Sequence, residues 1–256
     1  KIGELIGHLN AVIFSPEDLF IVKEGPSVRR RYIDITLSQL RPSYFFDLQQ
    51  YNRVLYQRNM LLKEIGAGRT SSSTLDVWTH HLIKIGSKII KRRQDFLYEL
   101  GKKARERHQK LTNCAEDLKL SYQPSFEIHE ESQLKDIEEI FQRELKKAEK
   151  RELQKCSTQL GPQRDDFDIH LNGLNTKQFG SQGQQRTSVL SLKLAEIDII
   201  FEEKQDYPIL LLDDVLSELD ENRQEYLYEN IGEVQTLITG TDVKKFANRN
   251  KNTSFF

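Results

Sequence analysis

The sequence lacks the features of a metal-cluster protein, a disulfide-bonded secreted protein and a membrane protein. Its two cysteines, Cys114 and Cys156, have no metal-ligand spacing, are too few for a disulfide framework and suit a reducing cytosol. No run reaches the roughly 18 apolar residues of a membrane helix, and no signal peptide is visible. We therefore expect no membrane contact, and 256 residues allow one large domain or two small ones.

An excess of positive charge is also absent. The chain has 38 basic and 39 acidic residues, for a formal net charge of −1. Proteins bind nucleic acid through clustered Lys and Arg, so any such surface here must be a local patch. Residues 29–31 are three consecutive arginines, which form such a patch or an ordinary solvated face. Adjacent helical residues do not share one face, so at most two of them contact one partner, and no nucleic-acid contact is assigned.

The stretch that carries the most information is Pro-Ile-Leu-Leu-Leu-Asp-Asp at residues 208–214. Four aliphatic residues in a row predict a strand buried on both faces of a parallel sheet. Asp213 and Asp214 follow where the strand ends, and ligands of open α/β sheets bind beyond that end. One Asp there can hold Mg²⁺ directly or through water, and another can orient an attacking water. The alternative is a core strand that runs into an acidic turn.

A second informative stretch is Gly-Ser-Gln-Gly-Gln-Gln-Arg at residues 180–186, before an apolar helical segment at 187–201. A helix N-terminus offers unpaired N–H groups, and with the Ser181 hydroxyl it suits a phosphate. The alternative is a flexible, capped helix start. The pieces also follow one another in a set order: this turn, a helix, a buried strand that ends in two Asp, and then Ser217 and Asp220. This order is a more specific sign of a nucleotide site than any single piece.

Together these stretches resemble the ABC/SMC class of ATPases. Residues 181–184 resemble its signature motif, residues 209–214 its Walker B strand, and Ser217 to Asp220 its D-loop. Within that class the chain resembles the RecF family of bacterial recombination proteins from about Leu9 to Thr241. Three stretches carry this resemblance: Phe-Ser-Pro-Glu-Asp-Leu at 14–19, Gly-Pro-Gln-Arg-Asp-Asp at 161–166, and Gly-Gln-Gln-Arg at 183–186. One departure is Gln163, where the RecF pattern usually has His.

The resemblance implies an α/β fold: a partial ABC/SMC-type ATPase head, mostly parallel sheet with flanking helices, and an inserted helical arm. The intact protein would use ATP and Mg²⁺ in recombinational repair, replication and the SOS response. An ATP-dependent homodimer would clamp double-stranded DNA near single-strand gaps and help load the recombinase with mediator proteins of the RecR and RecO type. Hydrolysis would be slow and DNA-dependent, and the location cytoplasmic, at the nucleoid.

The resemblance also implies roles for single residues. Asp213 would hold Mg²⁺, directly or through water, and Asp214 would orient or activate the attacking water. The signature residues of one subunit would contact the γ-phosphate bound to the other; they are Ser181, Gln182, Gly183 and Gln184. Ser15 lies near the class's Q-loop Gln, although residues 15–18 are also a good helix start. Thr241 stands where transporter proteins of the class carry a switch His, which disfavours a transporter motor.

A phosphate-binding loop ending in Gly-Lys-[Ser/Thr] does not occur in the sequence. RecF-like proteins carry it in an N-terminal lobe, and the first residue here is Lys1, so we expect a fragment of a longer product. Without that Lys and the loop's N–H groups, most contacts to the β- and γ-phosphates are missing. The chain alone is predicted neither to bind ATP tightly nor to hydrolyse it.

The predicted organisation is part of the head at 1–25, a helical arm at 26–157, and a C-terminal lobe at 158–256. Pro26 and Pro42 each predict a helix start, and the second helix continues to residue 65. Apolar residues at three-four spacing predict a long helix to about residue 111, which could pair antiparallel with a second one at 131–154. Alternating or apolar runs predict strands at 9–14, 118–122, 167–171 and 235–239.

Three alternatives stay open. The acids in residues 164–166 form an internal ion pair or belong to the site, and we favour the structural role. The arm can be the functional part, which would make the protein a non-catalytic module that docks DNA or a partner. The chain can also come from another short-armed SMC-like ATPase head.

Overall fold

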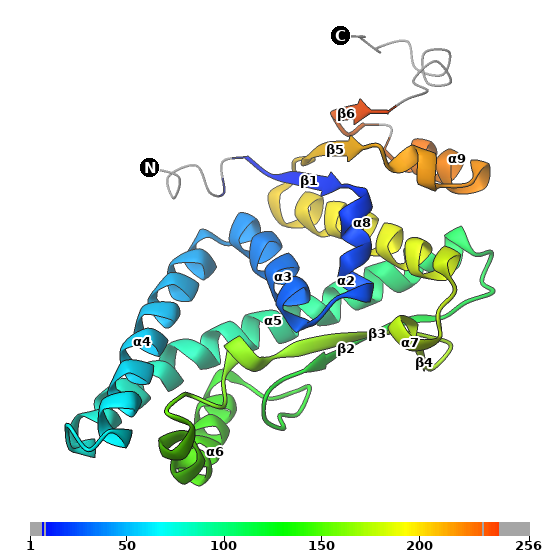
Figure 1. Cartoon of the computed structure of the whole chain (residues 1–256). Helices are drawn as coiled ribbons and strands as arrows, with labels where there is room; N and C mark the ends of the chain where they lie inside the picture. The colour runs from blue at the N-terminus through cyan, green and yellow to red at the C-terminus, as the bar shows by residue number, and fades with distance from the viewer. Residues whose placement is uncertain (1–6, 8, 232, 241–256) are drawn as a thin grey trace. The chain divides into compact units, whose positions relative to one another are not determined.

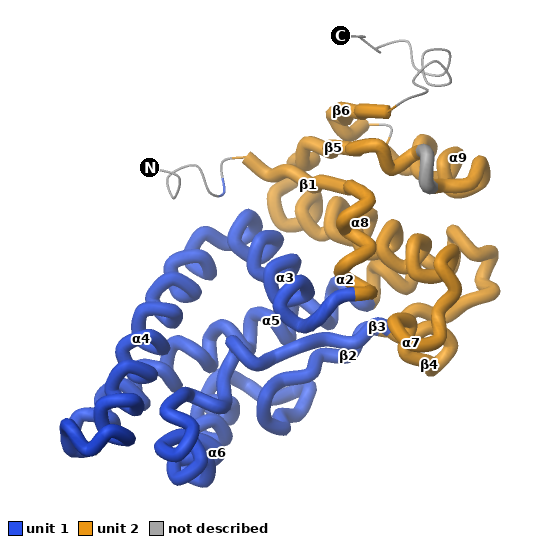
Figure 2. Tube along the Cα trace, viewed as in Figure 1, with its two compact units in different colours: residues 1–7, 24–101, 120–169 blue, residues 8–23, 102–119, 170–256 orange. Residues whose placement is uncertain are grey.

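The computed structural model describes residue 7 and the ranges 9–231 and 233–240 (Figure 1). The chain divides into two compact units (Figure 2). Unit 1 takes residues 1–7, 24–101 and 120–169, and unit 2 takes 8–23, 102–119 and 170–256. The boundaries of these two units differ from the predicted boundaries between head and arm. The division into head and arm stays a prediction.

Three elements run from one unit into the other: helix α5 (Leu75–Leu111) and the strands β2 (Leu118–Gln123) and β3 (Asp166–Leu171). The long α5 confirms the helix predicted from three-four spacing. At the end of β3, Asn172 and Gly173 adopt positive φ angles of 50° and 81° and turn the chain into β4 (Leu174–Asn175). An Asn-Gly pair favours such a two-residue hairpin turn, because both residues accept a positive φ angle.

Unit 1 is built mainly from helices α3 (Pro26–Leu40), α4 (Pro42–Gly66), α6 (Leu134–Lys155) and most of α5. Proline opens α3 and α4 as predicted, because its fixed φ suits the first helical position. Helix α6 packs against α4, and a Cβ added at Gly86 of α5 would lie 2.9 Å from the Phe141 ring of α6. Helix α6 thus packs against both α4 and α5, whereas the sequence predicted α5 as its packing partner.

Buried arginines hold unit 1 together. Arg58 Nη2 donates to Glu152 Oε2 at 2.6 Å, and Arg93 Nη1 donates to the Pro162 carbonyl at 2.6 Å. Arg93 also pairs with Asp34 at 2.8 Å. Burying a charge without a partner is costly, so each guanidinium carries a matched set of acceptors.

Two of the three consecutive arginines are part of this internal structure. Arg29 Nε donates to Asp166 Oδ1 at 2.7 Å, and Arg30 Nη1 donates to the Asp165 carbonyl at 2.7 Å. Asp165 is buried and accepts the hydroxyl of Tyr122 at 2.5 Å. Burial raises the pKa of Asp165, and Arg93 counteracts this rise. These acids therefore have the structural role that the sequence favoured, and of the three arginines only Arg31 is exposed.

Unit 2 contains a parallel sheet in the order β1 (Ala11–Phe14), β5 (Ile209–Asp213), β6 (Thr236–Thr239). Its buried face carries Val12, Phe14, Leu210 and Leu212, and β1 packs on helix α8 (Gln182–Lys204). Figure 1 shows α8 running along this sheet in the direction opposite to β5. Most of α8 is buried, because it carries apolar residues on nearly all sides.

The other face of the sheet is exposed in the described part of the chain. Ile13, Leu211 and Leu237 pair in register across the three strands, and Ile13 and Leu237 are 52% and 53% exposed. The prediction that β5 is buried on both faces is therefore wrong for Leu211, which is only half-buried. The reason is that burial alternates along each strand, and among the described elements only α8 covers a face of this sheet.

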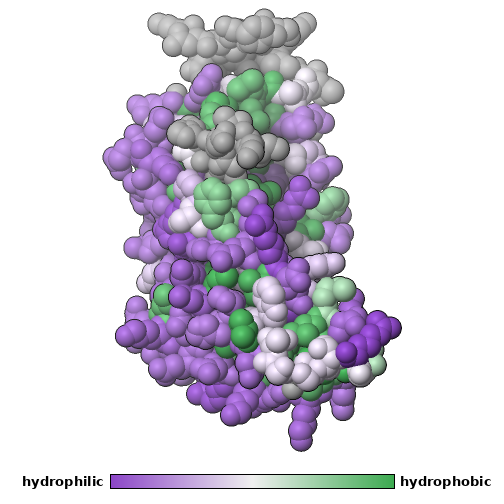
Figure 3. Space-filling model, turned by 90° about the vertical axis from the view of Figure 1, so that its left-hand side faces the viewer, coloured by the Kyte–Doolittle hydropathy of each residue, from purple (hydrophilic) through white to green (hydrophobic). Residues whose placement is uncertain are grey.

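The remaining elements are short or lie at the surface: η1 (Pro16–Leu19), α2 (Phe20–Lys23), η2 (Ser72–Thr74), η3 (Pro162–Arg164), α7 (Thr176–Phe179), η4 (Val215–Glu218) and α9 (Glu221–Asn230). The space-filling view of one side shows small hydrophobic groups within a mainly hydrophilic surface (Figure 3). Among the described helices, none combines the length and apolarity that crossing a bilayer requires.

Candidate nucleotide-contacting site

The predicted signature turn forms the N-terminus of α8. Ser181 is the N-cap residue, and its hydroxyl oxygen accepts the Gln184 N–H at 3.2 Å while Gln184 Oε1 accepts the Ser181 N–H at 2.8 Å. This reciprocal capping satisfies two of the helix's first N–H groups. Ser181 and Gln182 are exposed, so the turn faces outward with its positive helix end available to an anion.

The two glycines of this turn have different roles. A Cβ at Gly180 would lie 2.6 Å from the Thr176 carbonyl oxygen, so packing inside the chain requires glycine there. Among the described residues, a Cβ at Gly183 would meet only Arg223 Nη2, at the ordinary contact distance of 3.9 Å. Glycine costs a helix about 1 kcal/mol relative to alanine. The fold therefore has no packing need for Gly183, and the space above it is open to a ligand.

A chain of polar contacts lies behind the turn. Gln184 Nε2 donates to Glu116 Oε1 at 2.9 Å, and Glu116 Oε2 is 2.9 Å from His108 Nε2. His108 is fully buried, and its Nδ1 is 3.0 Å from Ser191 Oγ on α8. Burial lowers the pKa of His108, the Glu116 carboxylate raises it, and the Arg223 charge lowers it further. Sequence reasoning missed this group, because Glu116 lies 68 residues before its partner Gln184.

The predicted acidic pair lies at the carboxyl end of β5, and both residues are exposed. Thr239, at the end of β6, holds both of them. Its hydroxyl donates to Asp213 Oδ1 at 2.6 Å, and its carbonyl accepts the Asp214 N–H at 3.2 Å. Asp214 has a left-handed backbone with φ 51° and ψ 19°. Such a conformation is uncommon outside glycine and is found at functional turns. Thr239 was not predicted as a site residue.

The donor set suits Mg²⁺ in a nucleotide complex better than a metal held by protein alone. Within the described ranges, no group of three or more His, Cys, Asp or Glu side chains could hold a metal ion. Mg²⁺ commonly takes one or two carboxylates and completes its shell with phosphate oxygens and water. Asp213 fits this pattern, because it is exposed and Thr239 holds only one of its oxygens in a hydrogen bond within the described chain.

The other predicted site residues have mixed outcomes. Asp220 caps α9 by accepting the Arg223 N–H at 2.9 Å, and it forms an ion pair with the Arg223 side chain. Ser15 directly follows β1, and its N–H donates to Asp18 Oδ2 at 2.8 Å. The Ser217 side chain and all of Thr241 lie outside the described residues. Nothing in the structure tests the nucleotide roles of these residues.

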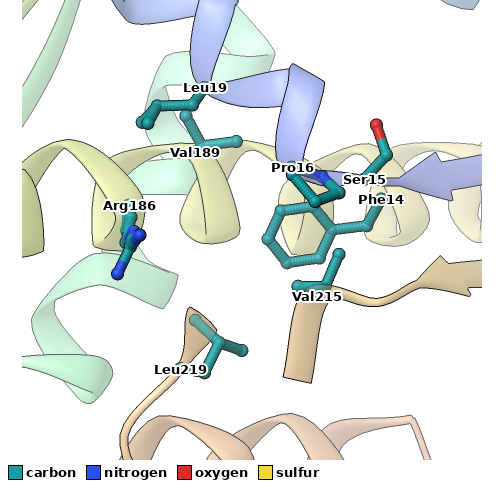
Figure 4. Close-up of a pocket in the computed structure, with 8 residues that line it drawn as sticks. All are labelled: Phe14, Ser15, Pro16, Leu19, Arg186, Val189, Val215 and Leu219. Carbon is teal, nitrogen blue, oxygen red and sulfur yellow. The ribbon is translucent and has the colours of Figure 1, made fainter. Parts of the chain in front are cut away.

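A small pocket lies where β1, α8 and the segment after β5 meet (Figure 4). Its lining residues are Phe14, Ser15, Pro16, Leu19, Arg186, Val189, Val215 and Leu219. It holds about 20 Å³, which is room for a single water molecule. The pocket is too small and too apolar for a nucleotide. Its lining comes from the first turns of α8 and from the segment that follows the two acids, so these two parts of the site lie close together.

No family model matches the chain. The DNA replication and repair protein RecF of Acetivibrio thermocellus is 56% identical over 250 residues, which cover 98% of this chain and 68% of that protein. The protein of the same name from Ruminiclostridium cellulolyticum is 48% identical over 257 residues, covering 100% of this chain and 69% of that protein. The chain belongs to the RecF family.

Solved structures agree with this assignment. The recombination mediator protein RecF-ATPrS in the RecFOR pathway matches with a TM-score of 0.88 and 41% identity, over 94% of this chain and 65% of that one. The RecF-ATP structure matches with a TM-score of 0.88 and 39% identity, over 98% and 65%. The chain thus spans about two thirds of these RecF proteins. The predicted α/β head of the ABC/SMC type is confirmed, and a non-catalytic module or another SMC-like head is not favoured.

Proposed function

We propose that the protein carrying this chain binds ATP with Mg²⁺ and acts on DNA in recombinational repair and replication. Membership in the RecF family supports this, since the relatives are named DNA replication and repair proteins. The similar solved structures are described as RecF with ATP or ATPrS. The Gly-Lys-[Ser/Thr] loop is absent from the 256 residues, which span about two thirds of these relatives.

The observation that carries the proposal is the outward-facing start of α8. Its capping box leaves the first-turn N–H groups of Gln182 and Gly183 for an outside partner. In the described hydrogen bonds the Ser181 hydroxyl serves only as an acceptor, so its own proton can be donated to a phosphate oxygen. Because the turn points away from its own chain, it serves a nucleotide held by a second copy.

The acids at the end of β5 supply the rest of the chemistry. Asp213 holds the metal ion, directly or through water, with its orientation fixed by the Thr239 hydroxyl. Asp214 orients the attacking water and accepts its proton, and its left-handed backbone turns the chain away from the sheet at this point. Mg²⁺, when bound, neutralises the charge that builds up on the phosphates. Ser15 and the D-loop residues Ser217 and Asp220 border the nucleotide.

At the level of the assembly, ATP joins two copies into a homodimer that clamps double-stranded DNA near single-strand gaps. Mediator proteins of the RecR and RecO type bind this complex and load the recombinase at the nucleoid in the cytoplasm. Hydrolysis is slow and opens the clamp. Because the net charge of the chain is −1, DNA binding rests on a local basic patch and weakens steeply with salt.

The test replaces Asp214 with Asn in a protein that includes the upstream segment. Removing a general base costs about 10²–10⁴ in the rate of the chemical step. We expect D214N to bind ATP, to stay dimeric after ATP is added and to lose hydrolysis in single-turnover assays. D206N is the matched control, since Asp206 is exposed on the loop before β5. A D214N protein that hydrolyses ATP at the rate of D206N would refute the assigned role.

A further inference from the structure

Glu116 stands between the signature turn and the end of α5. Its Oε1 accepts the Gln184 amide and its Oε2 faces His108 Nε2, both at 2.9 Å. The loop that carries Glu116 is held firmly in unit 2. The Asp117 N–H donates to Asn172 Oδ1 at 2.8 Å, and the Asp117 carbonyl accepts the Asn172 N–H at 2.9 Å. The carboxylate is therefore presented to Gln184 from a fixed position.

An amide side chain has two ends of opposite character, and Gln184 uses both. Its Oε1 accepts the Ser181 N–H at 2.8 Å, while its Nε2 points at Glu116. If the amide turned over, Nε2 would face another donor at Ser181 and Oε1 would face a carboxylate. An ionised Glu116 accepts hydrogen bonds only, so it selects the one amide orientation that caps the turn.

His108 fixes Glu116 in turn and connects it to α8. The ring is fully buried, and its other nitrogen is 3.0 Å from Ser191, two turns along α8 from Gln184. Further ion pairs hold the same stretch of α5 to α8: Arg107 with Asp198 at 2.5 Å and Lys103 with Glu202 at 2.5 Å. The carboxylate thus rests on the helix whose first turn it supports.

We propose that Glu116 is a positioning residue for the phosphate-contacting turn: through the Gln184 amide it holds Ser181 and the first turn of α8 in the geometry that receives the nucleotide of a second copy. The proposal rests on the proposed function in naming the nucleotide as the ligand. It also changes the predicted role of Gln184. Both ends of its amide are engaged within the chain, so Gln184 supports the turn rather than contacting the γ-phosphate.

The first test needs no nucleotide and uses this chain itself. We expect amide hydrogen exchange at Ser181 to be about tenfold faster in E116Q, because a hydrogen bond to a charged group is replaced by one that no longer selects the amide orientation. E106Q is the matched control, since Glu106 is exposed on α5 two residues before His108. Equal exchange at Ser181 in E116Q and E106Q, with circular dichroism confirming that both are folded, would overturn the inference whatever the protein does with ATP.

The second test uses the protein with its upstream segment and separates two steps. ATP affinity is measured with a fluorescent ATP analogue at a protein concentration where dimers are absent, and ATP-dependent dimerisation is measured by sedimentation. E116Q should keep the affinity of the monomer for the analogue and weaken dimerisation about tenfold or more. A loss of nucleotide affinity in the monomer as large as the loss of dimerisation would contradict a role limited to the turn.

A reversed pair supplies the rescue. Q184E alone places two carboxylates together and should weaken dimerisation, whereas E116Q/Q184E restores a donor opposite an acceptor and keeps a side-chain oxygen for Ser181. Recovery in the double variant supports positioning, and a double variant as weak as either single one refutes it. If the unchanged protein fails to dimerise with ATP, the proposed function is wrong, while the hydrogen-exchange result still decides the role of Glu116.

Discussion

Adding one methyl group to the signature turn separates its structural role from its functional role. In G183A the new Cβ lies 3.9 Å from Arg223 Nη2, an ordinary contact that displaces nothing. Alanine favours a helix over glycine by about 0.5–1 kcal/mol, and in the first turn we expect the lower value. The free energy of unfolding should therefore rise by about 0.5 kcal/mol, which raises Tm by about 1–2 °C.

The same methyl group should damage function. It occupies the open side of the turn, where a phosphate approaches the first-turn N–H groups of α8. Losing one hydrogen bond to a charged group costs about 1.5–3 kcal/mol, which weakens ATP-dependent dimerisation tenfold or more. We therefore expect G183A to be more stable in urea unfolding and to dimerise more weakly in sedimentation with ATP.

G180A is the matched control three residues earlier. Its Cβ would lie 2.6 Å from the Thr176 carbonyl oxygen, so the backbone must shift, at a cost of about 1–3 kcal/mol. G180A should therefore unfold at lower urea concentration than the unchanged protein. A G183A protein that is less stable than G180A, or that dimerises with ATP as well as the unchanged protein does, would refute this role for Gly183.

Three other properties can be tested: the pH dependence set by His108, the Arg58–Glu152 ion pair, and ATP binding by the chain alone. Burial lowers the pKa of His108, so below about pH 6.5 the unfolded chain binds a proton that the folded chain does not, and the free energy of unfolding decreases as the pH is lowered. Urea unfolding between about pH 7.5 and 5.5 should show a smaller decrease in H108Q than in the unchanged protein, and H80Q is the control. E152Q should lower the unfolding free energy by about 3–5 kcal/mol, because it leaves the buried Arg58 without its charge partner, and an unchanged urea midpoint would count against this. The 256-residue chain alone should bind ATP only weakly in calorimetry, and a low micromolar dissociation constant would contradict the need for an upstream loop.

Local sequence signals predicted the helices and strands well, because the start and end of a helix or strand depend mainly on residues that are close in sequence. The helix starts at Pro26 and Pro42 and the long helix α5, predicted from three-four spacing, all appear where predicted. The positions of the signature turn and the acidic pair were predicted too, since both follow from what begins or ends an element. Burial of the sheet was predicted less well, because it depends on which neighbour covers each face.

The supporting residues of the site were not predictable in the same way. Glu116 and His108 reach Gln184 across a gap of about 70 residues, and Thr239 reaches Asp213 across 26. A polar residue in a loop or strand has no local pattern that names its partner. Only the packing of α5 on α8 and of β6 on β5 brings these groups together.

The uncovered aliphatic row of Ile13, Leu211 and Leu237 has a practical consequence for every assembly assay on this chain. Three strands set about 4.8 Å apart carry this row on one face of the described sheet. We expect copies of the isolated chain to associate through this aliphatic row as the protein concentration rises, with or without nucleotide. A nucleotide-free dilution series is therefore the baseline against which any ATP-driven pairing has to be judged.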